Sequence, residues 1–188
     1  MRHPPDAVYA DVRDTDPDVL DANGLDTYLD RVAQLRAWCA AREVRATRAQ
    51  RRLAAEGRAA EPQHSLAENG RQSSKDAKAA AEREQVCTAM PGFEDALADG
   101  AVSAGHIDAV ASATKHLDEM ETTEFVAQAE SLISEAGKQG VDAFARGCRD
   151  LATSIRARHN ARSDVDELER QRAQSKVTRW VDRTTGMH

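Results

Sequence analysis

Four arginines recur at three- and four-residue intervals within a basic stretch between residues 31 and 58: Arg42, Arg45, Arg48 and Arg52. On a helix this spacing places them along one side, where several guanidinium groups can meet successive phosphates of a nucleic acid. The stretch holds eight Arg against two Glu. A solvated helix face, paired with the acidic residues that precede it, is the alternative interpretation and the preferred one.

A second group of cations lies in a segment with the pattern of a helix-turn-helix, residues 65–83. A short helix, a turn at Gly70 and a second helix with a polar start can place side chains in the major groove of DNA. Arg71, Lys75 and Lys78 are chemically suited to phosphate contacts there. The simpler alternative, a corner that packs a helical bundle, is preferred over DNA binding.

The histidines do not form a catalytic or metal-binding pattern. His106 stands near a predicted helix start with no Asp, Cys or second His at ligand or triad spacing, so we expect a packing or hydrogen-bonding role. His159-Asn160 has the residue types of a metal-dependent nuclease, which needs a further metal-holding side chain on a ββα hairpin. Only His188 follows, and no strands flank the pair, so we reject a nuclease site here.

No other chemical motif stands out in the 188 residues. The sequence contains no P-loop, dinucleotide-binding fingerprint, nucleophile elbow or zinc spacing. Three widely spaced cysteines, Cys39, Cys87 and Cys148, are expected to be buried free thiols. We therefore predict no catalytic residue, no metal, no cofactor and no small-molecule substrate for this chain.

Composition limits the partners. The net charge is -6 and the apolar fraction 40%, with no apolar run of the length that a signal peptide or membrane span requires. These values favour a cytoplasmic protein with no membrane partner. Overall negative charge opposes tight nucleic-acid binding, so any DNA binding is expected to be weak and salt-sensitive.

The elements that must position these residues are predicted to be helical, which gives a mainly all-α fold. Alanine is abundant, with 35 copies against 5 prolines. We predict five segments: a flexible acidic leader at 1–20, a long helix at 21–57, a linker and turn at 58–72, a helical bundle at 73–175 and the start of a β-hairpin at 176–188. The bundle helices are expected near 73–90, 103–117, 122–136 and 141–158.

The long helix shows a heptad-like apolar seam interrupted at Arg42. The seam comprises Leu25, Tyr28, Val32, Leu35, Cys39, Ala46, Ala49 and Leu53. A narrow stripe on a helix of this length needs a partner helix. The partner can come from the same chain or from a second copy, and a homo-oligomer through residues 25–53 is the second possibility.

Two segments carry a resemblance to a known family: Ser65-Leu66-Ala67-Glu68-Asn69-Gly70-Arg71-Gln72-Ser73-Ser74-Lys75-Asp76-Ala77 and Pro91-Gly92-Phe93-Glu94-Asp95-Ala96-Leu97-Ala98-Asp99-Gly100-Ala101-Val102-Ser103-Ala104-Gly105-His106-Ile107-Asp108-Ala109-Val110. With the terminal residues 179–188, they resemble the actinobacterial domain of unknown function 222. That helical region usually precedes an HNH endonuclease module, often in mobile-element contexts. Residues 179–188 look like the family's first strand and turn, cut before the returning strand.

The resemblance implies a non-catalytic helical region of an HNH-endonuclease-like protein, supporting DNA engagement or self-association. The family's catalytic His and Asn belong to the later module, so no position of this chain receives a catalytic role. A divalent metal is expected only in that module. The alternative is a structural or interaction scaffold that does not bind nucleic acid.

Overall fold

The computed structural model describes residues 5–174, which form nine α-helices and one short 3-10 helix, with no strand among them. Their bounds are α1 Pro5–Asp14, η1 Pro17–Val19, α2 Ala22–Ala55, α3 Pro62–Glu68, α4 Ser74–Ala89, α5 Gly92–Ala98, α6 Ala104–Thr114, α7 Glu119–Val126, α8 Ala129–Ala136 and α9 Val141–Gln174. The all-α prediction is confirmed, and the predicted hairpin start at 176–188 lies outside the described residues. Within the described range no helix is long and apolar enough to cross a membrane.

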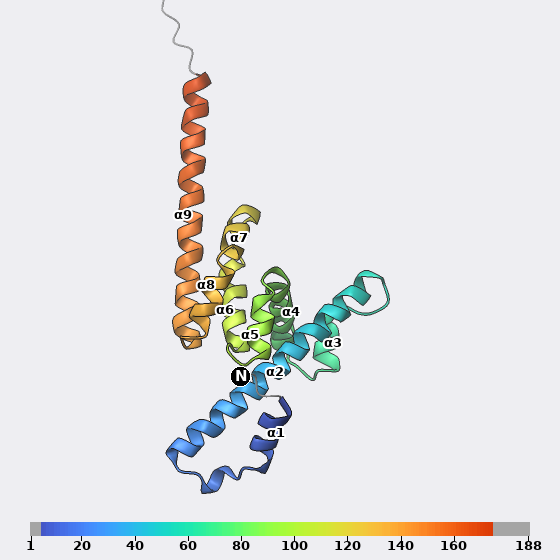
Figure 1. Cartoon of the computed structure of the whole chain (residues 1–188). Coiled ribbons are helices and arrows are strands. Elements are labelled where there is room, and N and C mark those ends of the chain that lie inside the picture. The colour runs from blue at the N-terminus through green and yellow to red at the C-terminus, as the bar shows by residue number, and fades with distance from the viewer. Residues whose placement is uncertain (1–4, 175–188) are drawn as a thin grey trace, which may run out of the picture.

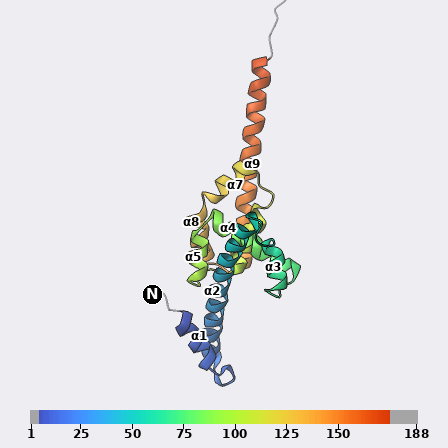
Figure 2. The same ribbon diagram turned by 90° about the vertical axis from the view of Figure 1, so that its right-hand side faces the viewer.

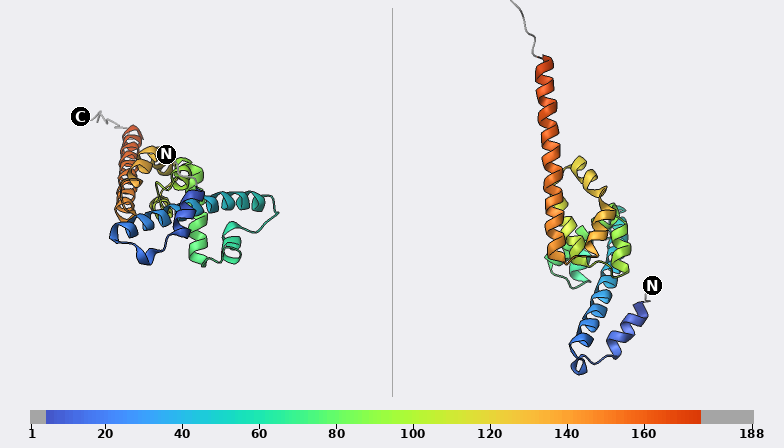
Figure 3. Two further views of the ribbon diagram at one scale, coloured as in Figure 1. Left: turned by 60° about the horizontal axis from the view of Figure 1, so that its bottom comes forward. Right: turned by 60° about the vertical axis from the view of Figure 1, so that its left-hand side comes forward.

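The helices form a central bundle with two extensions on opposite sides (Figures 1 and 2). We call the first extension the arm: it comprises α1, η1 and the first half of α2, residues 5–36. The second is the C-terminal half of α9. Figure 3 shows the same arrangement from two further directions. The bundle itself contains the second half of α2 with α4, α5, α6, α7, α8 and the first half of α9, and α3 packs beside α4.

The core of the bundle is built from a few large side chains and many alanines. Phe93, Leu97, Ile107, Phe125 and Ile155 are completely buried. Burying each side chain of this size contributes about 1.5–3 kcal/mol relative to exposure. These residues come from α5, α6, α7 and α9, so the core joins helices that are distant in sequence.

The predicted flexible leader was wrong for the residues that the structure describes. Residues 5–14 form α1, which packs on α2 and buries Val8 to 5% exposure. The Asp16 side chain then caps η1 by accepting a hydrogen bond from Asp18 N at 3.1 Å. One buried valine and the local caps were enough to order a segment that its Asp-rich composition had marked as irregular.

The predicted heptad seam was also wrong as the buried face of α2. The helix buries Ala37, Ala41 and Val44, whereas Leu25 and Cys39 are exposed. Alanines let α2 approach α4 and α5 closely, so small side chains define the contact. A search for large apolar residues at heptad spacing gave them too little weight.

The remaining predicted helices are confirmed with altered ends. The single helix predicted at 122–136 is two helices, α7 and α8. The first begins earlier than predicted, at a capping box between Asp118 and Glu121, and ends at Val126. The helix predicted to end at residue 158 continues as α9 through Gln174, 34 residues in all. At a rise of 1.5 Å per residue α9 is about 50 Å long.

Candidate nucleic-acid interface

The corner between α3 and α4 has the short-helix, turn, second-helix arrangement that the sequence predicted. Ser73 Oγ accepts a hydrogen bond from Asp76 N at 3.1 Å and caps α4. A Cβ added at Gly70 would lie 2.5 Å from the carbonyl oxygen of Leu66, so only glycine fits there. Arg71 adopts φ 53°, a left-handed conformation that costs about 1 kcal/mol for a side chain with a Cβ. The turn is therefore sharply bent.

The three predicted cations of this corner all lie on its surface. Arg71, Lys75 and Lys78 are exposed, and Lys78 Nζ is 3.8 Å from the carboxylate of Glu82 one turn along α4. Gln72 instead turns inward and donates a hydrogen bond from Nε2 to Glu43. The corner thus presents a small cationic surface, while the Gln72 side chain is engaged by Glu43 of α2.

The arginine row of α2 has a different environment. Arg45 Nε donates to Glu94 Oε1 at 2.7 Å, and Arg48 Nη2 lies 2.7 Å from Glu94 Oε2. Arg48 Nε is also 3.6 Å from Glu84 Oε1, and Arg51 Nε donates to Glu84 Oε2 at 2.7 Å. We call these five residues the arginine–glutamate ladder. It joins α2 to α4 and α5.

The carboxylates of the ladder are the buried partners. The Glu84 and Glu94 side chains are 3% and 11% exposed, whereas the guanidinium groups of Arg45 and Arg48 remain partly accessible. Burial alone would raise the pKa of Glu94, but the hydrogen bonds from Arg45 and Arg48 outweigh burial and hold the pKa below its usual value. A phosphate that approached these arginines would have to compete with charged carboxylates already in place.

The other two arginines of the predicted row point elsewhere. The Arg42 guanidinium carbon lies 5.8 Å from the centre of the Trp38 ring, a cation–π contact on the surface of α2. Arg52 is exposed near the end of α2. The structure therefore divides the predicted set: Arg45 and Arg48 pair with carboxylates in the ladder, whereas Arg42 and Arg52 lie outside it.

A second ion-pair cluster, which the sequence analysis missed, surrounds Arg83 of α4. Its Nε and Nη2 each lie 3.0 Å from one oxygen of Asp108, and its Nη1 donates to Glu43 Oε2 at 3.3 Å. Arg83 is 9% exposed and links α2, α4 and α6. One feature of the sequence could have indicated this cluster: Arg83 and Glu84 are charged neighbours within the Ala- and Val-containing run of α4. Charged side chains that become buried with such a run need oppositely charged or hydrogen-bonding partners in the folded protein.

His106 has the hydrogen-bonding role that its position predicted. Its Nδ1 accepts a hydrogen bond from Ser103 N at 3.1 Å, which completes a capping box at the start of α6. Its Nε2 lies 3.0 Å from Gln139 O, and its ring meets Phe144 edge-on at 5.4 Å between centroids. With Nδ1 accepting, Nε2 must carry the proton and donate to Gln139. Both nitrogens are used in packing the bundle.

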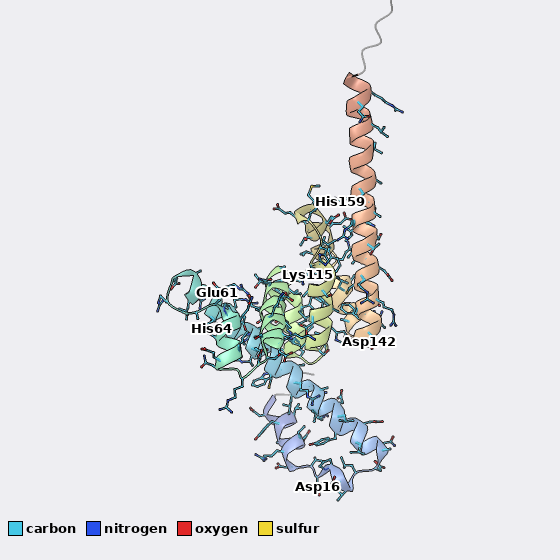
Figure 4. The ribbon with its side chains drawn as sticks, turned by 180° about the vertical axis from the view of Figure 1, so that it is seen from behind. Asp16, Glu61, His64, Lys115, Asp142 and His159 are labelled. Carbon is cyan, nitrogen blue, oxygen red and sulfur yellow. The ribbon has the colours of Figure 1, made fainter. Side chains whose placement is uncertain are left out.

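His159 joins two helices. Figure 4 labels it where α9 runs beside α7. Its Nε2 lies 2.8 Å from Glu124 Oε2, and Arg158 donates to the other oxygen of the same carboxylate. The hydrogen bonds from Arg158 and from His159 lower the pKa of Glu124. This pairing explains the histidine as a link between α7 and α9.

The thiols and acidic side chains that the structure describes do not assemble a reactive centre. Among those described side chains, no group of three or more His, Cys, Asp or Glu could hold a metal ion. Burial raises the pKa of Cys87 to about 12 and that of Cys148 to about 11, so both stay protonated and unreactive. The prediction of buried thiols holds for these two but was wrong for Cys39, which is exposed.

Comparison of the chain with protein-family models, with curated proteins and with solved structures finds no match.

Proposed function

We propose that residues 5–174 are a non-catalytic helical scaffold, the helical region of an HNH-endonuclease-like protein, in which the bundle holds α9 as a rigid spacer. The observation that supports this most is the arginine–glutamate ladder. The arginines that could have formed the strongest phosphate-binding row are paired with buried carboxylates of α4 and α5, while their own side chains stay partly exposed. Their contribution is to the stability of the scaffold.

The shape of α9 supports the spacer role. Among the described side chains of α9, Ile155 is the last that is completely buried, and beyond it Val165 and Leu168 are more than half exposed. Figure 1 shows this half of α9 extending past the bundle. A helix with mostly polar residues that leaves its domain in this way is typical of a connection between modules. The family resemblance supplies the module type, an HNH nuclease.

Distance measurements between spin labels test the rigid spacer. Cys39 is exposed and Arg172 lies near the end of α9, so labels at Cys39 and at Arg172→Cys report the position of the helix end. Cys87 and Cys148 are buried and would not react. We expect one narrow distance distribution, and Val165→Pro should broaden it. A broad distribution in the unkinked chain would contradict a rigid spacer.

Metal-dependent DNA cleavage tests the non-catalytic part of the proposal. With Mg²⁺, Mn²⁺ or Zn²⁺ present, the purified chain should leave plasmid DNA intact. Cleavage that disappears in the His159→Ala variant would overturn the proposal, because it would assign chemistry to a residue that links α7 and α9. The variant's melting temperature must be measured alongside, since losing the Glu124 contact weakens that link.

A second candidate function, weak DNA binding, is favoured by one observation: Arg71, Lys75 and Lys78 are all exposed on a helix-turn-helix-like corner. Phosphate contacts from three cations would give weak, salt-sensitive and nearly sequence-independent binding. Replacing all three with Gln should abolish any shift of short duplexes at low salt, and replacing Arg42 and Arg52 should reduce it less. Unchanged mobility of the duplexes in the presence of the wild-type chain would rule out this DNA binding and leave the scaffold as the proposed function.

A further inference from the structure

The arm carries an apolar helix face that no other described element covers. Leu25, Leu29 and Val32 follow one another at four- and three-residue spacing along α2. Leu25 is 38% exposed and Leu29 60% exposed. Val32 lines a hollow of about 400 Å³ between α1 and α2, together with Val12, Leu35, Arg36, Cys39, Ala40 and Glu43. Leu25 and Leu29 form a ridge on this face of α2. Because Val32 follows them on the same face, the ridge and the hollow form one continuous surface.

Exposed large apolar side chains are concentrated on this extension. Among the described residues eight are exposed in this way, and four of them belong to the arm: Tyr9, Val19, Leu25 and Leu29. Single exposed leucines are ordinary, but a set gathered on one projecting element marks an interaction surface. Figures 1 and 2 show that the arm is free of the bundle on most of its sides.

The charge around this surface is strongly negative. Over the arm, residues 5–36, the sequence holds eight aspartates and three basic residues, Arg13, Arg31 and Arg36, of which Arg36 lines the hollow. All eight aspartates are exposed, and Arg13 is already paired with Asp14 at 2.7 Å. Figure 4 labels Asp16 at the outer end of the arm. Asp26 and Asp30 follow Leu25 and Leu29 in the sequence, so they lie along one side of the ridge that these leucines form.

This charge decides which partner fits. A second arm placed on the same surface would bring two sets of aspartates together, and nucleic acid would be repelled for the same reason. An amphipathic helix with Leu or Val on one face and Lys or Arg beside it would match both features at once.

We infer that the arm is a docking site for a basic amphipathic helix of a partner protein. The apolar face of that helix packs on Leu25, Leu29 and the hollow beside Val32, while its cations meet Asp26 and Asp30. This site is separate from the α3–α4 corner and from α9. Its test is therefore independent of the tests of the scaffold and of DNA binding.

A labelled synthetic helix of leucine and lysine is the probe. Fluorescence anisotropy should report binding to the whole chain, weakening as salt rises because the charges are at the surface. Leu25→Ser with Leu29→Ser should raise the Kd at least about tenfold, since two exposed leucines lose their buried area. The matched control is Val165→Ser with Leu168→Ser, which removes two exposed apolar side chains from α9 and should leave the Kd unchanged.

Further variants of the probe and of the protein identify the partner that occupies the site. A helix with Glu in place of Lys, or Ser in place of Leu, should not bind, and Asp26→Asn with Asp30→Asn should weaken binding of the lysine helix. Far-ultraviolet circular dichroism confirms that each variant is folded. Equal loss of binding in the α9 control would overturn the inference. So would a wild-type dimer in sedimentation that Leu25→Ser with Leu29→Ser dissociates, because a second copy would then be the occupant.

Discussion

The two halves of α2 belong to one helix and have opposite roles. The first half, with α1, carries exposed leucines and aspartates and lies outside the bundle. The second half buries Ala41 and Val44 and directs Arg45, Arg48 and Arg51 at carboxylates of α4 and α5. The comparison shows that a block of like charge acquires its role from what it faces. The arginines face buried glutamates, and the aspartates face solvent.

Thiol reactivity is expected to show the largest difference between bundle and exposed surface. Cys39 is exposed on α2, whereas Cys87 and Cys148 are buried with pKa values raised to about 12 and about 11. At mildly alkaline pH a thiol-specific reagent should modify one cysteine rapidly and the other two more than about a thousandfold more slowly, because both thiolate formation and access require opening of the bundle. Three rapid thiols would contradict the described core.

Removing Arg83 should produce the largest loss of stability among the ion pairs. Arg83→Ala leaves Asp108 and Glu43 without their shared partner in a partly buried site. We expect the free energy of unfolding to fall by about 2–3 kcal/mol. Urea denaturation measures the loss.

The control for Arg83 is an ion pair of the arm. Arg13 and Asp14 are both more than half exposed, so Arg13→Ala should leave the free energy of unfolding indistinguishable from that of wild type. If Arg83→Ala and Arg13→Ala lowered the free energy of unfolding equally, the ion pairs of the bundle would contribute no more to stability than those of the arm, which would contradict this prediction.

Acid should weaken the ladder through Glu94. Because the folded-state pKa of Glu94 lies below its ordinary value of 4.5, its stabilising contribution is present above that pH and disappears as the pH falls through the folded pKa. Glu94→Gln should therefore be less stable than wild type at neutral pH, and the difference should narrow below pH 4.5. Asp26→Asn, an exposed carboxylate of the arm, should show no such convergence in urea titrations at several pH values.

Much of the fold could be predicted from periodicity alone. The helices near 73–90 and 103–117 correspond to α4 and α6, because apolar spacing and the caps at Ser73 and Ser103 are local signals. The face that α2 buries could not be predicted in this way. Its contact depends on Ala37 and Ala41 fitting α4 and α5, which is a tertiary property.

The candidate site was predictable in part. The exposed cations at Arg71, Lys75 and Lys78 followed from the turn at Gly70 and a polar helix start. The pairing of Arg45 and Arg48 did not, since Glu84 and Glu94 are 36 to 49 residues away in the sequence and meet them only in the folded bundle. Spacing along a helix shows which side chains share a face, but it does not show what that face meets.

We propose that the arginine row of α2 stabilises the bundle and does not serve as a phosphate-binding surface. The most direct measurement pairs urea unfolding with duplex mobility for the Arg45→Gln, Arg48→Gln double variant. Because Glu94 is nearly buried and loses both partners, the free energy of unfolding should fall by about 2 kcal/mol while duplex mobility stays as in wild type. Loss of duplex binding with unchanged unfolding free energy would contradict the claim.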